Sequence, residues 1–203
     1  MSTTPLPNGG PVEGLMPTIH SERATLRALR PSDSGSLFSL LTTEAVGRFI
    51  LPPPSSVERF GHFIDWTRRQ EEAGRHLCFG IVPAGHDEAV GLIQVRRETP
   101  ESTTAEWGFV LSERFWGTGL FVASSEVVLN FLFSTVGIHR LEARTIVGNG
   151  RAGGALQKLG AVQEGVLRHG FCRNGDYSDQ ILWSILADDW ARLHAAPPAE
   201  TLH

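Results

Sequence analysis

The sequence predicts an α/β domain, classed as α+β in some schemes, built on a mixed, largely antiparallel sheet of seven strands with helices on both faces. The first observation is the order of the periodic segments: strand, two helices, three strands, helix, strand, helix and two strands. The second is that short links join the three consecutive strands, which is typical of antiparallel neighbours. The third is a later strand–helix–strand crossover. Together these observations exclude a purely doubly wound sheet.

The expected elements leave little of the chain unassigned. In chain order they are a strand at 23–29, a helix starting at 31–33, a loop at 51–56, a helix at 57–70, strands at 76–82, 89–97 and 103–111, a helix at 117–135, a strand at 139–147, a helix at 149–159, strands at 162–172 and 177–186, and a helical turn or two at 187–193.

In the amino-terminal half, the segment 23–29 alternates between polar and apolar residues, as a half-buried strand does. The sequence Pro-Ser-Asp at 31–33 offers a helix start, and the leucines that follow recur at helical spacing. Three prolines at 52–54 make the next segment a loop. The second helix is expected because Phe60, Phe63 and Ile64 fall on one of its faces.

In the carboxy-terminal half, the short links at 83–87 and 99–101 separate the three strands. The helix at 117–135 is the most apolar, but polar residues at 124–126 interrupt it, and it is too short to span a bilayer. Gly160 is expected to end the following helix. The last two strands are expected to pair as a hairpin around 173–176.

The length and charge of the chain limit its class. Its 203 residues suit one domain, expected at 18–194 between a flexible arm at 1–17 and a flexible tail at 195–203. With 18 basic and 22 acidic residues, the net charge of −4 gives no electrostatic footprint for nucleic acid. No lysine or arginine precedes Arg23 and no apolar run follows Met1, so no signal peptide is expected. We expect a cytoplasmic protein that binds neither nucleic acid nor membrane.

The cysteines and histidines do not indicate a metal site or a disulfide. Cys78 and Cys172 lie far apart and are expected to be small apolar fillers. The eight histidines show no His-Glu-x-x-His spacing, and no paired Cys-x-x-Cys occurs. No metal is therefore expected.

The segment between the strand that ends at Leu111 and the long helix carries the clearest chemical signal. It reads Glu-Arg-Phe-Trp-Gly-Thr-Gly-Leu over 113–120, with glycines that permit tight turns and close approach of a ligand. The first N–H groups of the following helix lack intrahelical partners and lie at its positive end, where a pyrophosphate fits. The Gly-Lys-Ser/Thr of a Walker loop is absent, and Val122 stands where a dinucleotide loop needs a third glycine. The alternative is a plain glycine turn.

The pattern Arg114-x-x-Gly117-x-Gly119 resembles the acetyl-CoA loop of the GNAT superfamily of N-acetyltransferases, and Trp116 before the first glycine resembles its RimJ/RimL branch. Further landmarks of that branch fall in the same order, and the resemblance covers about residues 20–192. They are the opening strand and turn at 23–33, Ala-Glu-Trp-Gly-Phe at 105–109, Asn149 with Leu-Gln-Lys-Leu-Gly at 156–160, Glu-Gly-Val-Leu-Arg at 164–168, and Asp-Trp at 189–190.

The resemblance implies that the sheet is split between its fourth and fifth strands and that acetyl-CoA, as co-substrate, lies in the split. Backbone groups near Phe109, Val110 and Leu111 would pair with pantetheine, and Asn149 would bond the same arm. Backbone N–H groups from Trp116 through Gly117, Thr118 and Gly119 to Leu120 would hold the pyrophosphate, with Arg114 in the motif. Lys158 is a candidate for the phosphate side, or an ordinary surface lysine.

Three positions depart from the family pattern. Phe121 stands where a small residue is usual, which puts in question how closely the loop packs. Ala152 replaces a common serine and removes a candidate hydroxyl. Ala161 replaces a common aromatic residue.

Glu106 is the candidate base for the chemistry. Strand alternation puts it on one face with Thr104, Gly108 and Val110, close to where the thioester would lie. The alternative is a solvated or ion-paired strand carboxylate. The family's usual helix tyrosine is missing, so Tyr177, the only tyrosine, is a candidate acid or a packing residue in the hairpin.

The function expected is transfer of an acetyl group from acetyl-CoA to a primary amine, either a protein N-terminus or a small-molecule amine, by direct attack. Two alternatives stay open. One is a non-catalytic acyl-CoA-binding or regulatory protein on the same fold, suggested by Ala152 and the missing tyrosine. The other is a transferase for a longer acyl group such as succinyl. The sequence leaves open the amine and whether the chain forms a homodimer.

Overall fold

The computed structural model describes residues 16–195. The expected tail lies outside these residues apart from Ala195, and so does the expected arm apart from its last two residues. Of these, Met16 is buried, and its backbone N–H donates to the Glu71 carboxylate. The folded part of the chain therefore includes this methionine.

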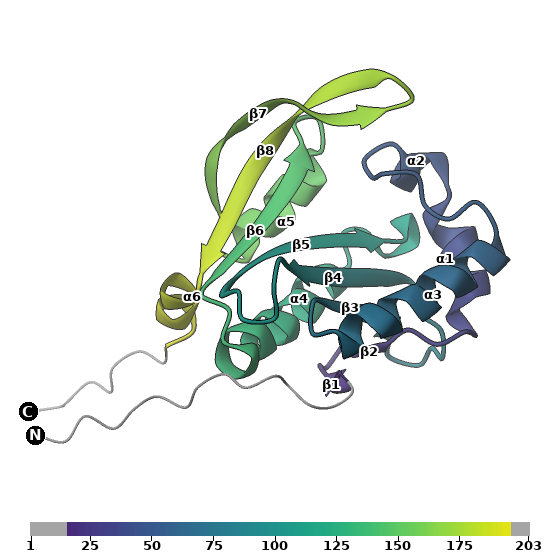
Figure 1. Cartoon of the computed structure of the whole chain (residues 1–203), viewed down its shortest axis with the longest axis horizontal. Helices are drawn as coiled ribbons and strands as arrows, with labels where there is room; N and C mark the ends of the chain where they lie inside the picture. Colours follow the sequence, from purple (N-terminus) through teal and green to yellow (C-terminus); the bar gives the residue numbers. More distant parts are fainter. Residues whose placement is uncertain (1–15, 196–203) are drawn as a thin grey trace, which may run out of the picture.

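The described residues form one sheet of eight strands in the order β1-β2-β3-β4-β5-β6-β8-β7 (Figure 1). The strands are β1 (Ile19–His20), β2 (Ala24–Ala28), β3 (His76–Pro83), β4 (Gly91–Arg97), β5 (Thr104–Leu111), β6 (Arg140–Ile146), β7 (Val162–Arg173) and β8 (Asp176–Leu186). All neighbours are antiparallel except β5 and β6, so the mixed, largely antiparallel sheet is confirmed. The expected count of seven missed β1, which at two residues is too short to show alternation.

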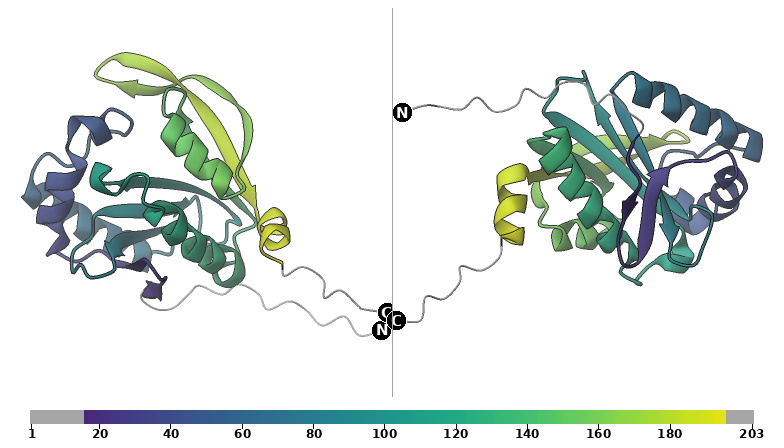
Figure 2. Two further views of the ribbon diagram at one scale, coloured as in Figure 1. Left: turned by 180° about the vertical axis from the view of Figure 1, so that it is seen from behind. Right: turned by 90° about the horizontal axis from the view of Figure 1, so that it is seen from below.

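Helices cover both faces of the sheet, as expected (Figure 2). They are α1 (Asp33–Leu41), α2 (Glu44–Gly47), α3 (Val57–Glu72), η1 (Glu113–Phe115), α4 (Leu120–Phe131), η2 (Leu132–Val136), α5 (Gly150–Lys158) and α6 (Ala187–His194). On one face, Leu37 of α1 and Phe60 and Ile64 of α3 pack on β3 and β4. On the other, α4 and α5 form the larger core, for example through Leu129 and Leu156. Because successive side chains of a strand point to opposite faces of the sheet, β3 and β4 contribute to both cores.

The sheet splits between β5 and β6. Within the described chain, these strands pair at three positions, where Thr104–Glu106 lie against Arg140–Glu142. Beyond them β6 stays paired with β8 and turns away from β5, carrying the β7–β8 hairpin with it (Figure 1). This is the split expected between the fourth and fifth strands of the predicted set.

A charged network holds the closed end of the split. Arg140 of β6 donates from Nη1 to Glu164 of β7 over 2.8 Å and from Nε to Glu142 over 2.8 Å. Ser184 of β8 donates its hydroxyl to Glu164 over 2.6 Å. The hydrogen bonds from Arg140 and Ser184 lower the pKa of Glu164 to about 2. The three strands are thereby tied together just where the cleft begins.

Three local expectations need correction. The helix expected from Gly117 begins at Leu120, because Gly117 and Gly119 are left-handed, and its last turn from Leu132 is a π-helix. The short α2 and η1 lie in segments for which the sequence predicts no helix or strand. Cys78 is buried as a filler, whereas Cys172 is exposed on the hairpin, and both are free in the described part.

No helix among the described residues is long and apolar enough to cross a membrane.

Candidate active site

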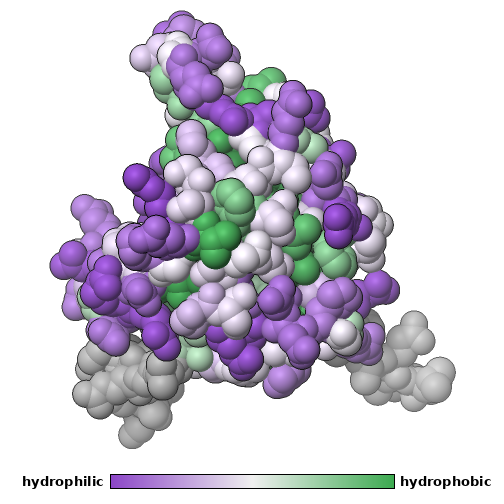
Figure 3. Space-filling view, turned by 90° about the vertical axis from the view of Figure 1, so that its right-hand side faces the viewer, coloured by the Kyte–Doolittle hydropathy of each residue, from purple (hydrophilic) through white to green (hydrophobic). Residues whose placement is uncertain are grey.

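A cleft of about 1490 Å³ opens where β5 and β6 separate. Its floor comes from β4, β5 and β6, one wall from α3 and the proline loop at 51–56, and the other from the β7–β8 hairpin. Viewed from the side of α1 and α2, the molecule shows apolar side chains gathered in the middle of the face with hydrophilic ones around them (Figure 3). The sheet split thus produces a large open site between two structural units.

The backbone at Trp116–Gly119, called here the glycine loop, enters α4 through two left-handed glycines. Gly117 has φ 76° and Gly119 has φ 80°, values that favour glycine strongly. The Thr118 hydroxyl donates to the Phe115 carbonyl over 2.8 Å and accepts from Leu120 N–H over 3.3 Å. The N-cap residue of α4, Gly119, has no side chain to cap the helix, so among the described side chains Thr118 alone accepts from a first-turn N–H group, and no acidic residue lies in that turn. The positive end of α4 is therefore free to face an anion.

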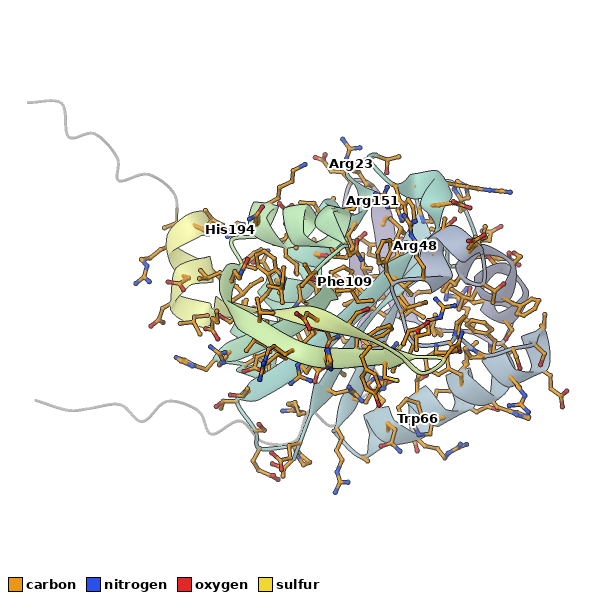
Figure 4. The ribbon with its side chains drawn as sticks, turned by 90° about the horizontal axis from the view of Figure 1, so that it is seen from above. Arg23, Arg48, Trp66, Phe109, Arg151 and His194 are labelled. Atoms are coloured by element: carbon orange, nitrogen blue, oxygen red, sulfur yellow. The ribbon has the colours of Figure 1, made fainter. Side chains whose placement is uncertain are left out.

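Two arginines that the sequence reasoning did not single out meet the glycine loop (Figure 4). Arg23 donates from Nη1 to the Thr118 carbonyl over 3.1 Å. The Arg151 guanidinium lies 3.8 Å from the centre of the Trp116 ring, whose Nε1 donates to the Leu111 carbonyl over 2.9 Å. Since Arg23 is 95 residues from Thr118, no local pattern could have indicated that contact. Both guanidinium groups add positive charge beside the end of α4.

The other two predicted cationic residues, Arg114 and Lys158, lie outside the lining of the cleft. Arg114 lines a separate depression of about 550 Å³ together with Asp87 and Glu88. Lys158 is exposed in the last turn of α5.

The part of β5 beyond its pairing with β6 borders the cleft. Phe109 and Val110 line it, whereas Leu111 is buried. On the opposite face, Phe121 packs its ring 4.4 Å from that of Phe109 and stacks on Trp107 at 6.3 Å. The unusual phenylalanine thus fills the space between α4 and β5. Beyond Glu106, the edge of β5 that faces β6 is not paired with a described strand.

Asn149 caps α5 at the cleft. Its side-chain oxygen accepts from Ala152 N–H over 3.2 Å, and both residues line the cleft. The cap uses the oxygen of the amide and leaves its NH₂ group as a donor.

Glu106 lies on the cleft floor in a row with Gly108 and Val110. Its Oε2 lies 3.3 Å from Arg144 Nη1 on β6, and its Oε1 lies 3.7 Å from Arg96 Nη2 on β4. The side chain is 36% exposed. The carboxylate is therefore ion-paired and faces the site at the same time. The sequence did not indicate the two arginines.

Tyr177 lies apart from these groups. It is 63% exposed near the tip of the hairpin, where its ring lies 5.6 Å from that of His169. It is outside the described lining of the cleft.

Known proteins are similar to this chain in sequence and in fold. The profile of the acetyltransferase (GNAT) domain matches residues 23–162. YdaF of Bacillus subtilis, named as a candidate ribosomal N-acetyltransferase, is 26% identical over 176 residues, covering 84% of this chain and 94% of that protein. The spermidine N(1)-acetyltransferase of Escherichia coli K12 is 25% identical over 182 residues, covering 90% and 95%.

A solved structure has the same fold. Mycobacterium smegmatis RimJ, in complex with CoA-disulfide, superposes with a TM-score of 0.74 at 23% identity, covering 82% of this chain and 83% of that one. The profile match spans well over half of the chain and confirms the resemblance drawn from the motifs. The chain belongs to the GNAT acetyltransferase family.

Proposed function

We propose that this protein transfers an acetyl group from acetyl-CoA to a primary amine by direct attack. One observation carries the proposal: β5 borders the cleft at Phe109 and Val110 with an edge that β6 leaves unpaired, and the chain then passes through the glycine loop into α4, whose start has Arg23 and Arg151 beside it. That arrangement suits a long co-substrate with an amide-bearing arm and an anionic head.

The residues fit acetyl-CoA along this path. Peptide groups of 109–111 would pair with the pantetheine amides, and the Asn149 NH₂ would donate to the same arm. The N–H groups of 116–120 would bind the pyrophosphate, and Arg23 and Arg151 would add charge to that end. Arg114 and Lys158 are kept as candidates for the phosphate side. Acetyl-CoA supplies the activated acyl group.

The chemistry needs a neutral amine, an oxyanion site and a departing thiol. The amine nitrogen attacks the thioester carbonyl, the C–S bond breaks, and the amine proton passes to Glu106, directly or through water. Backbone N–H near Val110 would stabilise the oxyanion. A thiol with pKa ~8.5 leaves with little acid assistance, so Tyr177 is the weaker assignment.

The phosphate end is tested by titrating acetyl-CoA into the wild type and Gly119→Glu by calorimetry. The new side chain should block the glycine loop by bulk and charge, weakening binding by about tenfold or more. Gly85→Glu is the matched control, because Gly85 is also left-handed at φ 79° but lies in an open turn away from the cleft. If the wild type does not bind acetyl-CoA, the proposal is rejected.

The base is tested by thiol release in Glu106→Gln at about pH 7.5. We expect kcat/KM for an alkyl amine of pKa ~10.4 to fall by about a hundredfold, with a smaller loss for an α-amine of pKa ~8. Acetyl-CoA binding should persist, and the exposed Glu72→Gln serves as control. Full activity in Glu106→Gln removes Glu106 from the base role.

The amine screen includes peptide N-termini and polyamines, because the relatives' names refer to ribosomal and spermidine acceptors.

The second candidate is a non-catalytic acyl-CoA-binding protein, favoured by Ala152, which contributes only its backbone N–H to the cap of α5. It predicts tight binding without transfer. Competition between acetyl-CoA and succinyl-CoA tests the third, a longer acyl group. A cytoplasmic location and a homodimer are further proposals, and sedimentation measures the latter.

A further inference from the structure

The lining of the cleft is charged oppositely to the chain as a whole. The protein carries a net charge of −4. The cleft is lined by Arg59, Arg96 and Arg144 against Glu58 and Glu106, so its arginines outnumber its carboxylates by one. A positive lining in a negative protein favours an acceptor that has an acidic group.

Two of the arginines lie beside Glu106 on the floor. Arg96 is its cross-strand neighbour on β4, and Arg144 approaches across the split from β6. Their side chains are 63% and 41% exposed. Exposed ion pairs of this kind contribute little to stability, so both guanidinium groups can rearrange to bind a ligand.

Gln94, the next inward-facing residue of β4, adds a neutral donor to the same floor. Its Oε1 lies 3.1 Å from Nε2 of His76, which is 3% exposed. Burial lowers the pKa of His76 to about 4, so the ring is neutral, and its Nε2–H donates to Gln94. With its oxygen engaged, the Gln94 amide keeps its NH₂ group as a donor at the cleft.

We propose that the acceptor is an amine that carries a carboxylate close to its nucleophilic nitrogen. The carboxylate would bind Arg96, Arg144 and the Gln94 amide, and the amine would face Glu106. A polyamine is less suitable, because its positively charged groups would approach Glu106 beside the two guanidinium groups and be repelled by them. This inference rests on the proposed function and narrows its substrate class. Free amino acids and peptides with an acidic first residue both present this chemistry.

Matched acceptors test the proposal in the wild-type protein. The pair phenylalanine and phenylalaninamide tests free amino acids, and the pair Asp-Ala-amide and Asn-Ala-amide tests peptide N-termini, with spermidine as the cationic comparison. In at least one pair we expect kcat/KM for the acid to exceed that for the neutral partner by about tenfold or more. The amide of an amino acid has the less basic amine, so amine reactivity alone would favour the opposite order. A preference for spermidine or for both neutral partners overturns the proposal.

Variants locate the recognition. Arg144→Gln and Arg96→Gln should each bring the ratio of kcat/KM for the acid to kcat/KM for its neutral partner down towards one. Because both acceptors are compared in the same variant, any change at the neighbouring Glu106 affects both and leaves this ratio as the measure of recognition. Arg68→Gln, on an exposed position of α3 outside the cleft, is the matched control and should keep the preference. A preference that survives both cleft substitutions also overturns the proposal.

Binding separates the inference from the transferase function. If no amine releases thiol, the acids are titrated by calorimetry into the protein saturated with CoA. Binding that Arg144→Gln weakens by about tenfold supports the acid-binding floor and rejects the transferase. Absence of binding overturns both. Transfer with the opposite acceptor preference overturns only the inference.

Discussion

Replacing Asp33 should destabilise the fold more than any exposed substitution, because this carboxylate is fully buried and anchors three segments. It accepts from Arg27 Nη1 and Nη2 over 2.8 and 3.0 Å, from Arg30 N–H over 2.7 Å, and from Ala89 N–H over 2.9 Å. Arg27 itself is 5% exposed. The pair therefore joins β2, the start of α1 and the segment before β4.

The magnitude follows from what Asp33→Ala leaves behind. The substitution buries an unpaired guanidinium and removes the acceptor of two backbone N–H groups. Breaking a buried pair in this way costs about 3–5 kcal/mol. For a chain of this size, that lowers Tm by roughly 6–20 °C. Asp33→Asn keeps an oxygen acceptor, so its loss should be smaller.

The effect should also depend on pH. Burial raises the pKa of Asp33, but the hydrogen bonds from Arg27, Arg30 and Ala89 outweigh it and bring the pKa below its ordinary 3.8. The carboxylate therefore contributes its full stability above pH 3.8 and loses it as the pH falls further. The gap between wild type and Asp33→Asn should narrow in that acid range.

The assay is urea unfolding followed by circular dichroism at neutral pH, with a second series in acid. Asp65→Ala, at an exposed position of α3, is the control and should change the free energy of unfolding by less than about 0.5 kcal/mol. A loss below about 1 kcal/mol for Asp33→Ala would refute the argument that the buried pair anchors the fold.

Three further predictions concern stability. Burial lowers the pKa of His76 from 6.5 to about 4, so the unfolded chain takes up the proton first. As the pH decreases from 6.5 to about 4, the free energy of unfolding should therefore fall by about 3 kcal/mol. Subtracting the free energy of unfolding of His76→Phe from that of the wild type at each pH isolates this contribution. Gly91→Ala would place Cβ 2.5 Å from the Val110 carbonyl and should cost about 1–3 kcal/mol. Gly35→Ala, whose new Cβ would meet no described atom within 4 Å beyond its chain neighbours and the backbone of its own helix, should stabilise α1 by about 0.5–1 kcal/mol. Thermal melts of both glycine variants would show whether the two effects have opposite signs.

The sequence predicted most of the helices and strands, because their signals are local. Alternation at 23–29 and the face formed by Phe60, Phe63 and Ile64 record which side of each segment is buried. The glycines at 117 and 119 likewise indicated a turn into a helix, which the left-handed backbone confirms. The sequence did not predict the two-residue β1 or the start of α4 at Leu120, since neither feature produces a periodic pattern of apolar residues.

The acceptor half of the site was decided by the tertiary structure. The sequence singled out Glu106, but Arg96 and Arg144 reach it from a neighbouring strand and from across the split. Arg23 and Arg151 meet the glycine loop in the same long-range way, and Tyr177 is carried out to the hairpin tip. Secondary structure and the glycine loop follow from interactions within a few residues, so the sequence alone determines them. The charge of the cleft depends on which strands become neighbours, and that is settled only when the whole sheet packs.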